Sequence, residues 1–93
     1  MTTFDQIATK IVKEQELIIG PIAWQEAGKV SGLHFAATHD QVSIDDGNGG
    51  QVIDLLVGQY EHLFGRASRE VCRDAAAGLL ADLTPAQVPA SLR

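Results

Sequence analysis

Apolar residues recur at every third or fourth position along four segments of the chain, which is the spacing of one face of an α-helix. We expect helices over about 3–18, 21–30, 51–64 and 68–83. Gly20 and Pro21 separate the first two, because glycine suits the end of a helix and proline suits the first turn of the next. The helix over 51–64 has the broadest apolar face, so we expect it to form the centre of the core.

Between the second and third of these helices the pattern changes to an alternation of apolar and polar residues. Leu33–Ala37 and Val42–Asp45 alternate in this way, and residues 38–40 connect them, which is the pattern of a β-hairpin. The turn-forming run 46–50, Asp-Gly-Asn-Gly-Gly, then leads into the third helix. A two-stranded ribbon is marginal by itself, so the hairpin must pack on the helices or on a partner sheet.

Two short sequences of the capping-box type mark the starts of helices. Thr3 and Gln6 are expected to exchange hydrogen bonds at the start of the first helix. Thr84 and Gln87 repeat the arrangement after the fourth helix. A proline soon after this second box ends the helical turn, so residues 84–93 are expected to form a short turn and a tail.

The chain is expected to fold as one small globular domain over 1–93, because 93 residues leave no room for a second full domain. Four helices with a β-hairpin between the second and third place it in the α+β class, mostly helical, with the element order ααββαα. Apolar residues make up 45% of the chain and charged residues 20%, which argues against wholesale disorder.

The charge balance excludes two classes of partner. Seven Lys and Arg residues against twelve Asp and Glu residues give a net charge of −5, so we expect no nucleic acid and no membrane surface as partner. The apolar runs are only a few residues long, and no basic segment followed by an apolar one marks an export signal, which favours a cytoplasmic protein. The single cysteine excludes an internal disulfide.

The sequence indicates no metal site and no cofactor. The soft metal ligands are three histidines and one cysteine: His34, His39, His62 and Cys72. They lack the paired short spacings of a structural zinc site. The acidic pair Asp45 and Asp46 does not begin a loop with oxygen ligands at the EF-hand positions, and the glycines beside it lack the spacing of a phosphate-binding loop.

Catalytic motifs are absent as well, so an enzyme is the less favoured interpretation. The nucleophile motif Gly-x-Ser-x-Gly does not occur. Cys72 lies near a helix start with Arg69 and Arg73 beside it, an electropositive setting that favours a reactive thiol. It also lies on the apolar stripe of its helix, however, and free cysteine is among the most buried residue types. We therefore expect Cys72 to be buried.

The most distinctive charged feature is a row of arginines on the fourth helix. Arg66, Arg69 and Arg73 follow the i, i+3, i+7 spacing of one helical face, and Ser68 lies with them near the helix N-terminus. Such a group can bind phosphate or a carboxylate. Two acidic residues on the same helix can balance these charges, so a solvated face of ion pairs is the favoured interpretation.

These observations favour a small non-catalytic module for protein interaction or regulation, acting in a homodimer or a larger complex. The alternative is a module that binds an anion or a small ligand on the Arg66/Arg69/Arg73 face. For the homodimer we expect two hairpins to pair, since the outer strand edges carry unpaired backbone groups and no Lys or Pro to block them. No motif identifies a family, and the sequence leaves partner identity and pathway open.

Overall fold

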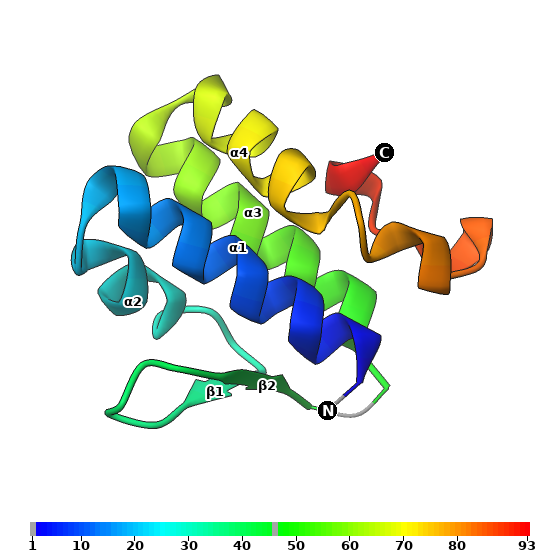
Figure 1. Cartoon of the computed structure of the whole chain (residues 1–93), viewed down its shortest axis with the longest axis horizontal. Helices are drawn as coiled ribbons and strands as arrows, with labels where there is room; N and C mark the ends of the chain where they lie inside the picture. Colours follow the sequence, from blue (N-terminus) through cyan, green and yellow to red (C-terminus); the bar gives the residue numbers. More distant parts are fainter. Residues whose placement is uncertain (1, 46) are drawn as a thin grey trace.

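The computed structural model describes residues 2–45 and 47–93, so Asp46 in the predicted glycine-rich turn lies outside the described residues. The elements are α1 (Thr3–Ile19), α2 (Ile22–Ala27), β1 (Leu33–Phe35), β2 (Val42–Ile44), α3 (Gly49–Phe64) and α4 (Arg66–Ala76). Three single-turn 3₁₀ helices follow: η1 (Leu80–Asp82), η2 (Pro85–Gln87) and η3 (Ala90–Leu92). The predicted α+β class with the order ααββαα is confirmed (Figure 1).

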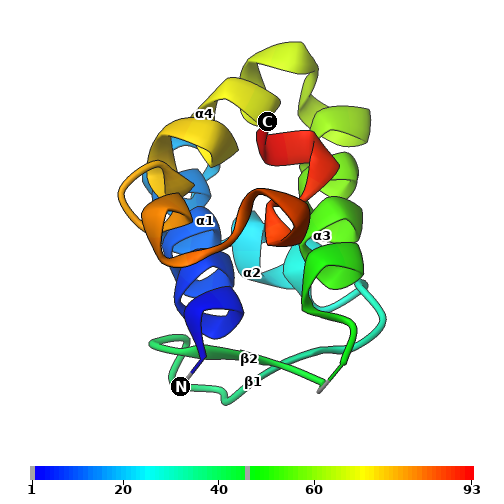
Figure 2. The same cartoon turned by 90° about the vertical axis from the view of Figure 1, so that its right-hand side faces the viewer.

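The helices α1 and α3 form the centre of the molecule and run side by side in the same direction (Figure 1). α4 runs back along both of them, and with the C-terminal segment it covers one side of the pair. α2 and the β-hairpin cover the other side (Figure 2). Gly65 alone separates α3 from α4, and its φ of +90° is one that glycine adopts without steric cost.

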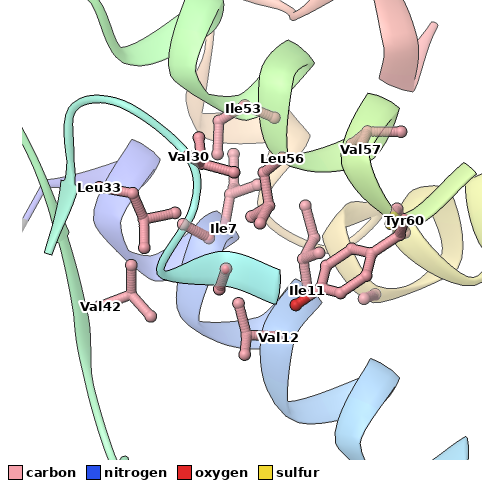
Figure 3. Packing of buried hydrophobic residues seen from close by; sticks show 14 of the residues in the cluster. Ile7, Ile11, Val12, Val30, Leu33, Val42, Ile53, Leu56, Val57 and Tyr60 are labelled. Atoms are coloured by element: carbon pink, nitrogen blue, oxygen red, sulfur yellow. The ribbon is translucent and has the colours of Figure 1, made fainter. Parts of the chain in front are cut away.

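Buried side chains from all of these helices and strands meet in one core (Figure 3). The stripes of α1 and α3 supply its centre: Ile7, Ile11, Val12, Ile53, Leu56, Val57 and Tyr60. Leu56 is fully buried, which agrees with the central place predicted for this helix. The buried Tyr60 hydroxyl donates to the Ala23 carbonyl at 2.6 Å, so its polar end is satisfied and α3 is joined to α2.

Several element ends lie elsewhere than the pattern predicts. α2 ends at Ala27 rather than at residue 30, α4 ends at Ala76 rather than at residue 83, and each strand has three residues. Gly28 and Gly78 follow these two helix ends within two positions, and glycine is unfavourable inside a helix. Apolar residues beyond α4 still pack against the core, which explains why the spacing resembled a longer helix: Leu79, Leu80 and Leu83.

The capping box of α1 is shifted by one residue from the prediction at Thr3 and Gln6. Thr2 Oγ1 accepts from the Asp5 N–H at 3.1 Å, and Asp5 Oδ2 accepts from the Thr2 N–H at 3.0 Å. A carboxylate in this position also interacts with the positive end of the helix dipole, which an amide does not. The charged acceptor therefore sets where the helix begins.

The C-terminal segment 84–93 packs on the helices, whereas the sequence predicted a turn and a tail. It begins with the predicted capping pair, in which the Thr84 N–H donates to Gln87 Oε1 at 2.9 Å. Leu92 is then buried, with 3% of its surface exposed, in a 3₁₀ turn that contacts α3 and α4. Asp54 on α3 accepts from the N–H and the hydroxyl of Ser91, at 3.0 and 2.6 Å, and so fixes this segment.

Candidate interaction surface

The predicted arginine group is divided in the structure. Arg66 and Arg73 are exposed and Arg69 is half-buried, but Ser68 is buried, with 7% of its surface exposed. The Ser68 carbonyl accepts from Gln15 Nε2 at 3.0 Å, which places Ser68 against α1. Residues two positions apart on a helix point in different directions, so Ser68 does not join the arginine face.

Two of the three arginines have acidic partners. Arg69 Nη1 lies 3.8 Å from Glu61 Oε2, and its Nε donates to a backbone carbonyl in η3 at 3.3 Å, so this side chain joins α4 to α3 and to the C-terminal segment. Arg73 Nη1 donates to Glu70 Oε1 at 3.2 Å. Among the described residues, Arg66 has no such partner. The geometry thus favours a face of ion pairs over an open anion site.

Cys72 is buried, as its position on the apolar stripe predicted. None of its surface is exposed, and Gln15 Nε2 lies 3.4 Å from its Sγ as a donor. Burial raises the pKa of the Cys72 thiol to about 11, from an ordinary value of 9.0. Cys72 is therefore a neutral thiol at pH 7, which is the opposite of an activated nucleophile.

A buried carboxylate on α2 is also paired. Glu26 Oε1 accepts from Gln59 Nε2 at 2.8 Å, and Oε2 accepts from Lys29 Nζ at 3.1 Å. These hydrogen bonds, above all the one from Gln59, lower the pKa of Glu26 below its ordinary value. Glu26 therefore stays ionised at neutral pH and joins α2 to α3.

Two of the three histidines have contacts of their own. His39 stacks on Trp24 with ring centroids 4.8 Å apart, and Phe35 packs edge-on against both rings. His34 Nε2 lies 2.8 Å from Asp45 Oδ1. Across residues 2–45 and 47–93, no three His, Cys, Asp or Glu side chains come together in a way that would hold a metal ion.

The outer edge of β2 is closed by α1, which corrects the prediction that both hairpin edges carry unpaired groups. The Val42 N–H donates to Thr9 Oγ1 at 2.9 Å, and the Ile44 N–H donates to Asp5 Oδ1 at 2.8 Å. A second hairpin can pair at this edge only if both hydrogen bonds break. Pairing with a second hairpin without loss of these bonds would therefore have to use the outer edge of β1, which is three residues long.

Of the six large apolar residues that are exposed in the described part of the chain, five lie in helix turns at one end of the molecule. They belong to the last turns of α1 and α3 and the first turn of α2, which lie together at the left in Figure 1. They are Leu17, Ile18, Ile22, Leu63 and Phe64, each with between 38% and 79% of its surface exposed. We call this part of the surface the open end.

Two residues of the open end continue the core-facing stripes of α1 and α3. Ile18 follows the buried Ile11 by seven residues, so it lies on the same side of α1. Leu63 follows the buried Leu56 by seven residues in the same way on α3. The chain turns away at a glycine of positive φ directly after each of these helix ends. The sequence spacing assigned these residues to apolar faces, but it does not show where the neighbouring elements stop.

Charges of opposite sign flank the two halves of the open end. Glu16 lies in the last turn of α1 beside Leu17, and no basic residue balances the negative end of the α1 dipole there. Arg66 begins α4 two residues after Phe64. Within the part of the chain that the structure describes, neither Glu16 nor Arg66 has an ion-pair partner. Charges of both signs also lie beside Ile18, which lines one pocket with Lys10, Glu14 and Asp74.

Comparison with known proteins assigns no function to this surface. No protein-family model matches the chain, and no curated protein and no solved structure matches it. Among the helices in the described ranges, none has both the length and the apolar character that a membrane span requires.

Proposed function

We propose that the chain is a small non-catalytic module for protein interaction, which binds through the open end and acts in a homodimer or a larger complex. The observation that carries this proposal is the exposure of Leu17, Ile18, Leu63 and Phe64 in the last turns of α1 and α3, two helix ends that lie at the same end of the molecule (Figure 1). The module acts in the cytoplasm, where its single free cysteine stays reduced.

The size of the open end supports an interaction role. With roughly 200 Å² for a fully exposed side chain of this kind, the exposed fractions correspond to an apolar surface on the order of 500 Å². The largest apolar patch of a typical monomeric protein is about 300–600 Å² and is often functional, so a surface of this size is compatible with a binding site. Covering it is favourable, because each Å² of apolar surface removed from water contributes about 25 cal/mol.

Three of the chain's reactive groups support binding over catalysis, because they join elements of the fold or are buried in it. Cys72 is a buried neutral thiol, and Glu26 is held by two hydrogen bonds. Arg69 joins three elements through Glu61 and η3. A catalytic group must reach substrate, and each of these side chains is already engaged within the fold.

Co-purification with matched variants tests the proposed function. Tagged wild type, Ile18→Ser and Leu55→Ser are expressed in the source cells, and the proteins that each retains are compared. Leu55 is a suitable control because 55% of its surface is exposed, close to the 63% of Ile18, but it lies outside the open end. We expect the wild type and Leu55→Ser to retain a protein that Ile18→Ser loses. A photo-crosslinking residue in place of Leu17 should attach to that same protein. Equal retention by all three chains, or by none, would refute the proposal.

A further inference from the structure

We infer that residues 36–40, which lie between β1 and β2, form a movable strap that closes over Trp24 with the ring of His39 as its latch. The strap is part of the hairpin turn and lies below α2 in Figure 1. This is a different part of the molecule from the open end, so the inference goes beyond the proposed function and does not depend on it.

The latch is a set of ring contacts between the strap, α2 and β1. The His39 ring lies on the indole of Trp24, with 6° between the ring planes and 4.8 Å between the centroids. Phe35, the last residue of β1, meets both rings edge-on, with its centroid 5.1 Å from that of Trp24 and 5.4 Å from that of His39. Stacked and edge-to-face pairs at these separations are favourable, so ring packing stabilises the closed strap.

The backbone of His39 opposes the closed state. Its φ is +53°, and within the described ranges no other residue except glycine has a positive φ. A residue with a Cβ is strained in this region, because the Cβ approaches a neighbouring carbonyl oxygen. Such strain persists only where the surrounding structure holds it, and it is found at ligand clamps and switch regions. Opening of the strap releases His39 to an unstrained backbone conformation.

Trp24 adds a second cost to the closed state. Only 1% of its surface is exposed, and its indole N–H has no acceptor among the residues that the structure describes. A buried donor without an acceptor is unfavourable, and the penalty is relieved when water reaches it. The strap covers one face of the indole, so its opening lets water approach the ring. Ring packing is thus balanced against strain and an unpaired donor, which is the condition for a two-state element.

The strap can move without breaking its own hydrogen bonds. The His39 N–H donates to the Ala36 carbonyl at 3.0 Å, and Thr38 Oγ1 donates to Asp40 Oδ1 at 3.0 Å, so both bonds lie within the strap. All five strap residues are exposed, and Ala36 and Asp40 at its ends line an open pocket of about 490 Å³. The hydrogen bonds from β2 to α1 keep the strand in place, which confines the movement to the strap.

Hydrogen exchange of the Trp24 indole N–H, followed by NMR, tests the inference on the full chain. Trp24 is the only tryptophan, so its indole signal is unambiguous. After correction for intrinsic rates, we expect this hydrogen to exchange about tenfold faster or more than the slowest amides of α3, which report global unfolding. Low urea concentrations should leave the indole rate unchanged, because strap opening exposes little surface. Exchange through global unfolding alone would overturn the strap.

Three variants at position 39 separate the latch ring from the backbone strain. His39→Ala removes the ring but keeps the strained φ of the closed state, so indole exchange should rise about fivefold. His39→Gly removes both the ring and the strain, so it should exchange about threefold more slowly than His39→Ala. His39→Phe keeps a flat ring on the indole and should stay within about threefold of the wild type.

His34→Ala is the matched control, because His34 belongs to the same hairpin but pairs with Asp45. Its indole exchange rate should equal that of the wild type. Equal rates in His39→Ala and His39→Gly would show that loss of the ring uncovers the indole without any movement, and would overturn the strap. A rise in His34→Ala as large as that in His39→Ala would overturn the latch, as would a His39→Phe variant that exchanges like His39→Ala. Protected α3 amides verify that each variant is folded.

Discussion

Asp5 stabilises the fold through two separable contacts, and its replacement tests whether α1 holds the hairpin in place. Its Oδ2 accepts from the Thr2 N–H within the capping box. Its Oδ1 accepts from the Ile44 N–H at the outer edge of β2, in a partly buried position. Asp5→Ala removes both contacts, whereas Thr2→Ala disturbs the capping box alone.

The two contacts differ in their expected magnitude. Loss of an N-cap side chain costs about 1 kcal/mol, so Thr2→Ala should lower the free energy of unfolding by about that amount. Asp5→Ala should cost about 2–4 kcal/mol, because a hydrogen bond to a charged acceptor contributes about 1.5–3 kcal/mol and the Ile44 N–H is left without a partner. Asp5→Asn keeps an acceptor at this position and should cost less than Asp5→Ala.

Urea denaturation followed by circular dichroism measures these free energies, and amide hydrogen exchange locates the effect. The Ile44 amide should be protected in the wild type and in Thr2→Ala, and it should exchange faster in Asp5→Ala. Equal destabilisation by Asp5→Ala and Thr2→Ala, together with an unchanged Ile44 exchange rate, would refute the role of Asp5 in holding the hairpin. Exchange at the centre of α3 serves as the internal reference for global unfolding.

Four further predictions follow from the core, the thiol, the C-terminal segment and the arginine face. Leu56→Ala should lower the free energy of unfolding by about 2–5 kcal/mol in urea, and a near-wild-type value would contradict the central place of α3. The pKa of Cys72 is raised to about 11 in the folded chain from 9.0, so its contribution to stability is complete below about pH 9 and is lost between about pH 9 and 11. Denaturation across this range should show a shallower decline in Cys72→Ala, and parallel curves would contradict the assignment. Asp54→Ala should speed exchange of the Ser91 amide by about tenfold, and an unchanged rate would show that Asp54 does not fix the segment. Titration with inorganic phosphate should give no saturable amide shifts confined to residues 65–74, whereas such shifts would support the anion-binding alternative.

The helices and the hairpin were predictable because their signals are local. The i, i+3, i+4, i+7 spacing of apolar residues depends only on a helix having one buried side, so it located the stripe that contains Ile11 and the one that contains Leu56. Alternation at Leu33 and Val42 located the strands for the same reason. Helix ends were less predictable, since apolar residues after Ala76 pack on the core in non-helical turns.

The features missed by sequence reasoning depend on contacts between distant segments. Asp5 sets the start of α1 and also holds β2, a contact across thirty-nine positions that no local pattern reveals. Arg69 reaches η3, and Ser68 turns towards α1, so the arginine group that looks continuous on a helical face is divided. The open end has the same origin: the spacing shows that Leu63 lies on the apolar face of its helix, but its exposure depends on where α1 ends and α4 begins.

The single-residue connection at Gly65 has a consequence for the order in which the molecule assembles. α3 and α4 are neighbours in the chain, so they can pair with very little loop to close, whereas α1 meets α3 only after the connection 20–48 has been closed. Loop closure costs more entropy for longer loops, and local contacts form faster than distant ones. We therefore expect the α3–α4 pair to form first and α1 to dock last. Because the open end takes its residues from both of these parts, a partly folded chain cannot present it, so the proposed recognition at this surface requires a molecule that has completed folding.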